Sequence, residues 1–247
     1  MCTVCGCSST KENSRLITIE QDILSNNNHR ATENRRQLQA KNIFTLNLVS
    51  SPGTGKTSLL VRTLNDLKND LDFFVIEGDQ QSQRDADRIR ATGVHAEQIN
   101  TGKGCHLDAS MIEDALQRLP IKNDAILFIE NVGNLICPAA FDLGEDITVA
   151  MLSVTEGDDK PLKYPDIFQA ADIVIITKID LLPHVDFDMA SCAENIKQIN
   201  NRATLIELSS KTGEGLQPWY QLLQQAHSNT NTYINNATAP PQPAHPR

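Results

Sequence analysis

A glycine-rich turn between an apolar run and a helical pattern constrains this chain more than any other stretch. The turn spans Ser50 to Thr57 and follows the pattern S-x-x-x-x-G-K-T, which is typical of phosphate-binding loops. Its two glycines let backbone N–H groups approach the phosphates, which side chains would otherwise obstruct. The first glycine of the usual pattern is Ser50 here, at a position with a loose steric demand. We therefore predict phosphate contacts from Gly53, Thr54, Gly55, Lys56, Thr57 and Ser58.

Side chains suited to catalysis are predicted around this turn. Lys56 supplies positive charge to the phosphates, and the Thr57 hydroxyl is placed to bind Mg²⁺. Asp79 and Glu130 each end an apolar run, and strand-end carboxylates line the ligand edge of α/β sheets. Gly133 follows Glu130 at the spacing of a glycine that senses the γ-phosphate. Asp79 has an alternative role as the N-cap of the following helix. The predicted catalytic residues are Lys56, Thr57, Asp79 and Glu130.

Short apolar runs alternate with helical patterns along most of the chain. Such runs are typical of parallel strands buried on both faces, and their alternation with helices is typical of α/β folds. The predicted fold class is an α/β P-loop NTPase with a mostly parallel sheet, helices on both faces and a flexible N-terminal metal-binding leader. Strands are expected at residues 44–49, 73–76, 96–99, 125–129, 147–154, 173–176 and 204–208, and helices at 56–67, 81–91, 189–199 and 216–225.

The motif Thr177-Lys178-Ile179-Asp180 follows the sixth predicted strand and predicts which base is bound. The Asp180 carboxylate can accept hydrogen bonds from guanine N1–H and N2–H₂ together, whereas adenine has a lone pair at N1 and no N2 amine. A site built to pair such groups discriminates by roughly 10⁴- to 10⁵-fold. Thr177 stands where Asn is more usual. The predicted base-binding residues are Thr177, Lys178, Asp180, Ser209, Ser210 and Lys211, and the predicted ligand is GTP or GDP.

Six cysteines occur in the chain, and three of them lie within the first seven residues. The amino-terminal stretch holds cysteines and charges where a signal peptide has an apolar segment, so we expect a cytoplasmic protein without structural disulfides. Three thiolates and a fourth donor suit Ni²⁺ or Zn²⁺. Cys2, Cys5 and Cys7 are therefore predicted metal ligands. A redox Cys-x-x-Cys pair and an incidental disordered tail are the alternatives.

Two further cysteines lie near the predicted nucleotide site. Cys105 and His106 are adjacent on a glycine-flanked segment, where neighbouring side chains can point to one metal ion, unlike on a regular strand. The two side chains fit two roles equally well. They could be metal ligands, or a buried thiol beside an imidazole that caps a helix. Cys137 lies seven residues after Glu130 on the same loop, so a shift of that loop with nucleotide state would move its sulfur. Cys192, within a predicted helix, is expected to pack in the core.

Length and charge limit the domain organisation and the partners. The 247 residues suit one domain with extensions, and the net charge of −9 argues against binding to nucleic acid or an anionic membrane. No apolar run reaches the length that spans a bilayer. We divide the chain into a cysteine segment (1–15), a helical lead-in (16–40) interrupted by the polar run 25–29, a GTPase domain (41–226) with an irregular loop at 155–165, and a disordered polar tail (227–247).

Together these motifs closely resemble the HypB-type nickel-insertion GTPase of nickel–iron hydrogenase maturation. The resemblance implies a GTP-hydrolysing metallochaperone that binds nickel and delivers it during that process. The motifs that carry it are Cys2-x-x-Cys5-Gly6-Cys7, the turn from Ser50 to Thr57, Gly104-Cys105-His106-Leu107-Asp108, Glu130-Asn131-Val132-Gly133-Asn134 with Cys137, and Thr177-Lys178-x-Asp180.

The resemblance also implies metal sites and partners. The three leader cysteines would form a tight nickel site. Cys105, His106 and Cys137 would form a second site, for Ni²⁺ or Zn²⁺, where two subunits meet in a GTP-dependent homodimer. The implied partners are a HypA-type nickel chaperone and the hydrogenase large-subunit precursor. Because the six histidines are scattered, we expect nickel delivery without bulk storage.

Two alternatives are compatible with the motifs. A urease or cobalamin-enzyme chaperone shares this class of sheet and nucleotide site but does not account for the leader cysteines. A metal-buffering or redox module with a regulatory nucleotide site belongs to a different functional class. Measuring GTP turnover with and without Ni²⁺ separates these possibilities.

Overall fold

The apolar runs form the strands of one parallel sheet. We describe a computed structural model of the chain over residues 7–228, with side chains from residue 21 onward. The seven strands are ordered β3-β2-β4-β1-β5-β6-β7. Their bounds are β1 Phe44–Ser50, β2 Phe73–Asp79, β3 His95–Asn100, β4 Ile126–Glu130, β5 Ile147–Ser153, β6 Ile173–Thr177 and β7 Thr204–Leu208. The predicted α/β class with a parallel sheet and all the predicted strands are therefore confirmed, with small shifts at the strand ends, whereas the flexible leader stays a prediction.

The parallel register gathers the strand ends at one edge. β1 lies between β4 and β5, and every strand pairing is parallel. β1 and β4 are buried along their whole length, as expected of parallel strands covered on both faces. Because all carboxyl ends point the same way, the loops after the strands meet at a single edge, where α/β sheets bind ligands.

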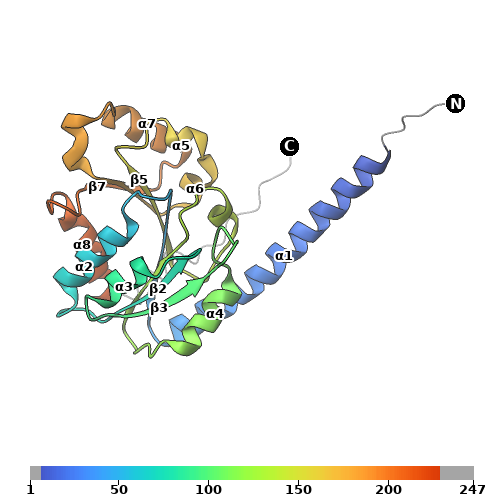
Figure 1. Cartoon of the computed structure of the whole chain (residues 1–247), viewed down its shortest axis with the longest axis horizontal. Helices are drawn as coiled ribbons and strands as arrows, with labels where there is room; N and C mark the ends of the chain where they lie inside the picture. Colours follow the sequence, from blue (N-terminus) through green and yellow to red (C-terminus); the bar gives the residue numbers. More distant parts are fainter. Residues whose placement is uncertain (1–6, 229–247) are drawn as a thin grey trace.

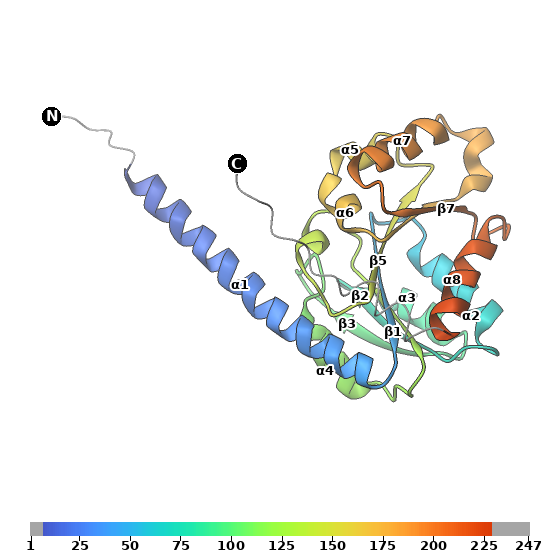
Figure 2. The same cartoon turned by 180° about the vertical axis from the view of Figure 1, so that it is seen from behind.

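Helices cover both faces of the sheet (Figures 1 and 2). On one face Trp219 packs near Phe128 of β4, and its indole N–H donates to the Thr63 hydroxyl at 2.9 Å. The helices that contribute to the core of that face are α2 Lys56–Leu67, α3 Arg84–Arg90 and α8 Leu216–Ser228. The opposite face carries α1 Cys7–Ala40 and α4 Ala109–Arg118 over one half of the sheet, and α6 Pro165–Ala170 and α7 Met189–Ile199 over the other.

Helix α1 runs without a break from Cys7 to Ala40, and its N-terminal half extends away from the domain (Figure 1). The predicted interruption at residues 25–29 is wrong. The Asn27 amide within that run is buried and bonded to groups outside the helix, so it does not compete for the helix backbone. The helix also begins inside the predicted cysteine segment. Cys2, Cys5, the Cys7 side chain and residues 229–247 of the predicted tail lie outside the described parts of the chain.

Helices also differ from expectation elsewhere. Helix α4 was not predicted; the Asp108 carboxylate caps its start by accepting from the Met111 N–H at 2.9 Å. The predicted loop at 155–165 contains the short helix α5 Lys160–Lys163 and the start of α6, because prolines are tolerated in the first turn of a helix. Short 3₁₀ turns are η1 Cys137–Ala140 and η2 Ile179–His184. Cys192 is fully buried in the core, as predicted. Among the described residues, no helix combines the length and apolarity needed to cross a membrane.

Candidate functional site

The phosphate-binding loop turns between β1 and α2 through two glycines in the left-handed region. Gly53 has φ 75° and Gly55 has φ 111°, values that other residues rarely adopt. A Cβ on Gly53 would meet no atom within 4 Å. Glycine is therefore favoured there by the backbone conformation and not by a lack of space. Helix α2 begins at Lys56. Its first N–H groups are therefore available to an anion held by the loop.

Lys56 is held by the residue that departs from the usual pattern. Its ammonium donates to the Ser50 hydroxyl at 3.0 Å (Nζ–Oγ), and the lysine is only 8% exposed. Burial lowers the pKa of Lys56, whereas the nearby Glu130 carboxylate acts in the opposite direction. The Ser50 hydroxyl in turn donates to the carbonyl oxygen of Ser51 at 2.7 Å. A glycine at position 50 could not make these bonds, so Ser50 orients the ammonium.

Two buried carboxylates lie side by side near Thr57. The Thr57 hydroxyl donates to Glu130 at 2.6 Å (Oγ1–Oε1), and Glu77 of β2 pairs in register with Glu130 of β4. Burial raises the pKa of Glu77 to about 8 and that of Glu130 to about 7. Within the described residues, neither carboxylate has a hydrogen-bond partner for its Oε2. Buried carboxylate oxygens without partners, beside a hydroxyl, fit the oxygen ligands that Mg²⁺ prefers.

Asp79 lies on the wall of the same cavity, but the backbone engages both of its oxygens. They accept from the N–H groups of Gln80 at 2.6 Å and Ser82 at 3.2 Å. Asp79 therefore closes the turn before α3, whose N-cap is Gln83. The cavity measures about 540 Å³ and is bounded by the phosphate loop and the ends of β2 and β4. Glu77, which also lines it, was missed by sequence reasoning; its one signal was its place near the end of an apolar run.

The segment after β4 passes directly against the phosphate loop. A Cβ on Gly133 would lie 2.9 Å from the Cα and backbone N of Pro52. Only glycine permits this approach of two backbones. The segment over residues 130–137 thus starts at the buried carboxylate of Glu130, touches the phosphate loop and continues toward Cys137.

The residues predicted to bind guanine gather around a second cavity of about 220 Å³ next to the phosphate loop. Asp180 accepts from the Ser209 hydroxyl at 2.6 Å. The Thr177 hydroxyl donates to the carbonyl oxygen of Thr54 at 2.7 Å, so this replacement for the usual Asn fastens β6 to the phosphate loop. The Lys178 ammonium adds a bond to the carbonyl oxygen of Gly53 at 2.7 Å. The predicted residues that line this cavity are Thr54, Gly55, Ser58, Thr177, Lys178, Asp180, Ser209, Ser210 and Lys211.

Glu156, after β5, braces the phosphate loop and was not predicted. Its carboxylate accepts from the Thr54 hydroxyl at 2.5 Å and from the Ser153 N–H at 3.1 Å. It also pairs with the Lys160 ammonium at 2.5 Å. Burial raises the pKa of Glu156, but the hydrogen bonds from Lys160 and Thr54 outweigh it and the pKa is lowered overall. No sequence pattern connects this glutamate with the loop, because the contact spans β1 to β5.

Cys105, His106 and Cys137 are brought together by two loops, and one ligand atom from each lies within 4.8 Å of the others. The two sulfurs are 2.9 Å apart, and Cys105 Sγ is 3.6 Å from His106 Nδ1. Burial lowers the pKa of His106, which favours the neutral form that binds metals. The hydrogen bond with Cys137 raises the pKa of Cys105. Asp108, not His106, caps the next helix, so the imidazole is not needed for capping. The two sulfurs and one imidazole nitrogen suit a soft or borderline cation such as Ni²⁺ or Zn²⁺.

Two asparagines tie the Cys105 loop to the segment after β4. Asn131 Oδ1 accepts from the N–H of Leu107 at 3.2 Å, and Asn134 Nδ2 donates to the carbonyl oxygen of Cys105 at 3.2 Å. Leu107 also packs closely against β2, because a Cβ on Gly78 would lie 2.8 Å from its side chain. The sulfur cluster is therefore connected to the strand ends that carry the buried carboxylates.

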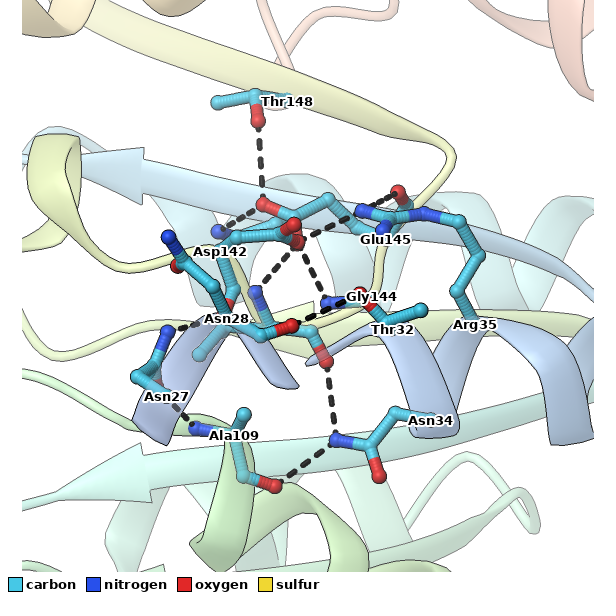
Figure 3. A network of polar contacts seen from close by, with 12 residues as sticks. Asn27, Asn28, Thr32, Asn34, Arg35, Ala109, Asp142, Gly144, Glu145 and Thr148 are labelled. Atoms are coloured by element: carbon cyan, nitrogen blue, oxygen red, sulfur yellow. Dashed lines mark hydrogen bonds and ion pairs between the residues drawn. The ribbon is translucent and has the colours of Figure 1, made fainter. Parts of the chain in front are cut away.

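Helix α1 is bonded to the segments that follow the two cluster loops through a polar network (Figure 3). Asn27 Oδ1 accepts from the N–H of Ala109 at 2.9 Å, and its Nδ2 donates to the carbonyl oxygen of Asp142 at 2.8 Å. Asn34 donates to the carbonyl oxygen of Ala109 at 2.8 Å. Ala109 follows one cluster loop, and Asp142 follows the other. The helix thus bridges both loops, through asparagines that nothing in the sequence distinguishes from ordinary surface residues.

Comparisons with known proteins agree with this arrangement. Residues 44–207 match the family described as CobW/HypB/UreG, nucleotide-binding domain. The chain is 58% identical over 210 residues to the hydrogenase maturation factor HypB of Rhizobium leguminosarum bv. viciae, covering 85% of this chain and 70% of the relative. It is 54% identical over 210 residues to the factor of the same name from Escherichia coli strain K12, covering 85% and 72%.

Solved structures lead to the same group. The fold is similar to that of HypB from Helicobacter pylori in complex with nickel, with a TM-score of 0.78 at 39% identity over 90% of this chain and 100% of that one. The hydrogenase maturation factor HypB of Archaeoglobus fulgidus gives a TM-score of 0.77 at 42% identity, over 82% and 99%. Because both sequence and fold agree over most of its length, this chain belongs to the HypB family of hydrogenase maturation factors.

Proposed function

We propose that this chain is a GTP-hydrolysing metallochaperone that binds nickel and delivers it during maturation of a nickel–iron hydrogenase. The observation that carries the proposal is the course of the segment 130–137. It begins at Glu130, which is bonded to Thr57, and ends at Cys137, which is bonded to Cys105. A change at the nucleotide phosphates therefore acts on the segment that also holds the metal. The relative from Helicobacter pylori that was crystallised with nickel supports the choice of cargo.

The nucleotide would be held at both ends. The phosphate loop and Lys56 bind the phosphates, and Asp180 pairs with guanine, with Ser209 fixing its carboxylate at 2.6 Å. Thr57 and Glu130 would hold Mg²⁺, which neutralises charge on the transferring phosphoryl group when it is bound. The predicted catalytic set is completed by Asp79 on the wall of the cavity.

The cargo would be controlled by the loop that senses the γ-phosphate. In the GTP state the segment 130–137 rests against the phosphate loop at Gly133 and completes the cluster of Cys105, His106 and Cys137 for Ni²⁺ or Zn²⁺. Hydrolysis removes the γ-phosphate, relaxes this segment and loosens the metal. The three leader cysteines, Cys2, Cys5 and Cys7, would supply a separate, tight nickel site.

Partners would meet the protein close to this cluster. Two GTP-bound copies would pair through the faces that carry it, which the 68% exposure of the apolar Ile136 beside Cys137 supports. An exposed large apolar side chain at such a place is typical of an interaction surface. A HypA-type chaperone would supply nickel, and the hydrogenase large-subunit precursor would receive it in the cytoplasm.

Coupled turnover and nickel release test the proposal. Nickel-loaded protein is mixed with GTP or a non-hydrolysable analogue, while phosphate and the capture of nickel by a coloured chelator are followed together. We expect slow phosphate release and faster nickel release with GTP than with the analogue. Lys56→Ala should reduce turnover at least about 100-fold, because it removes a preorganised charge at the phosphates. The exposed Lys197→Ala serves as the matched control.

The experiment tests GTP hydrolysis and its coupling to nickel release independently of each other. If wild type releases no phosphate from GTP, the enzymatic half is wrong. Nickel release at the same rate with GTP, with the analogue and in Lys56→Ala would contradict the coupling.

A further inference from the structure

Glu77 is a buried carboxylate whose protein surroundings do not account for it. It lies near the end of β2 and is 2% exposed, and its Oε2 has no hydrogen-bond partner in the part of the chain that the structure describes. Its register neighbour on β3 is Gln98, whose side-chain amide donates to the carbonyl oxygen of Ser82 at 2.5 Å. Burying a polar atom without a partner is unfavourable, and an apolar side chain would avoid that penalty. A bound ligand explains this residue better than stability does.

The register shows where such a ligand would lie. Glu77 and Glu130 are paired on neighbouring parallel strands, which are about 4.8 Å apart, and paired residues point to the same face. Val75 and Phe128, two residues earlier on the same strands, pack in the core beneath α2. The two carboxylates therefore open toward the same cavity, which is also lined by Thr57. Two oxygens without partners thus border one space at the phosphate end of the pocket.

We propose that Glu77 is a second buried carboxylate of the Mg²⁺ site, acting beside Glu130 as an acceptor for the hydrated ion that accompanies the nucleotide. The inference rests on the proposed function only in that a guanine nucleotide occupies this cavity. Mg²⁺ usually keeps several of its water ligands when it binds a protein. The two carboxylates provide hydrogen-bond acceptors for those waters. Without the cation, burying both carboxylates is unfavourable, because they cannot both be charged without repelling each other. Glu77 therefore raises Mg²⁺ affinity while it lowers the stability of the metal-free protein.

The variant Glu77→Gln keeps the shape of the side chain and removes its charge. The assay measures the Mg²⁺ concentration that half-maximally slows the release of a fluorescent GDP analogue. We expect this concentration to rise about tenfold, as for the loss of one charge-assisted hydrogen bond. Release in EDTA should match wild type. In the absence of Mg²⁺ and nucleotide, the melting temperature should rise by about 2–4 °C, because a neutral amide is less costly to bury than a carboxylate without its ligand.

Two further variants serve as controls. Glu77→Asp keeps the carboxylate and should retain more Mg²⁺ affinity than Glu77→Gln. Glu207→Gln makes the same chemical change on an exposed position of β7 and should alter neither readout.

Two results would overturn the proposal. One is an unchanged half-maximal Mg²⁺ concentration in Glu77→Gln. The other is a fall in melting temperature together with Mg²⁺ affinity, because Glu77 would then be a structural residue. The readouts do not depend on turnover. A protein that binds Mg²⁺ through Glu77 but hydrolyses no GTP would contradict the proposed function and leave this inference intact.

Discussion

The nucleotide pocket and the sulfur cluster share the segment 130–137, yet they are built in opposite ways. The pocket is assembled by one local motif and by the ends of neighbouring strands, whose positions the sheet register determines. The cluster comes from two loops that belong to no common element, and side-chain amides hold them together. The geometry of the pocket is therefore maintained by the sheet itself, whereas the geometry of the cluster depends on a few hydrogen bonds between distant segments.

The two regions also differ in how their polar groups are satisfied. In the pocket, Glu77 and Glu130 each have an oxygen without a partner among the described residues. Around the cluster, the amides of Asn27, Asn131 and Asn134 are bonded at both their oxygen and their nitrogen. Asn34 Oδ1 has no partner among the described residues, but it belongs to a neutral amide. The pocket is thus prepared for a charged ligand, and the frame of the cluster is prepared to hold its shape.

The largest effect should come from removing a sulfur of the cluster. We expect Cys137→Ala to weaken nickel binding at this site by at least about 100-fold, since changes outside the ligand set already cost about 10- to 100-fold. Affinity for GDP should stay within about twofold of wild type, because the pocket does not depend on this sulfur. Equilibrium titration with Ni²⁺ measures the loss, in a background with Cys2 and Cys5 replaced by Ala.

The matched control is Cys192→Ala, which removes a thiol that is fully buried in the core and is not one of the three grouped ligands. It should leave nickel affinity unchanged. Equal losses in both cysteine variants would mean that the cluster is not a distinct binding site.

A smaller effect should follow from loosening the frame. Asn27→Ala leaves the Ala109 N–H and the Asp142 carbonyl oxygen without their partner. We expect the free energy of unfolding to fall by about 1–3 kcal/mol and nickel affinity at the sulfur cluster to fall by about tenfold. GDP affinity should not change. Urea unfolding and nickel titration measure the two effects.

Asn28→Ala is the control, since Asn28 is the exposed neighbour on the same helix. If Asn27→Ala lowered GDP affinity as much as nickel affinity, the contrast between the two regions would be wrong.

The smallest effect should be a pH dependence confined to the pocket. The pKa of Glu77 is raised to about 8 by burial, so the folded state holds a proton that the unfolded state has released. Stability from this group is complete below the ordinary value of 4.5 and is lost as the pH rises through about 8.

Comparison of wild type with Glu77→Gln isolates this group from other buried carboxylates. Between pH 7 and 8, the metal-free wild type should lose about 1 kcal/mol relative to the variant, near the limit of about 1.4 kcal/mol per pH unit for one proton. Urea unfolding at each pH measures this difference. Parallel curves for the two proteins would mean that Glu77 does not titrate in this range.

The predicted and the missed features differ in range along the chain. The strands, the phosphate loop and the Asp180 motif were predictable because each is a pattern within a few neighbouring residues. Glu77 was missed although it precedes Asp79 by two positions, because only the register with β4 shows that it faces Glu130. Helix α1 was expected to break at its polar run, because the partners of Asn27, at the start of α4 and in the loop at Asp142, lie more than 80 residues away.

The sequence by itself determined the fold class and the nucleotide loop, and it predicts guanine as the base and the sulfur and imidazole groups as metal donors. These follow from local spacing and from the chemistry of individual side chains. Only the tertiary structure decided that Cys105 and Cys137 meet, that Ser50 and Thr177 replace the usual residues with bonds of their own, and that two carboxylates share one cavity. The reason is physical: strand order and loop packing join segments that are far apart in the chain, and no local pattern records which segments become neighbours.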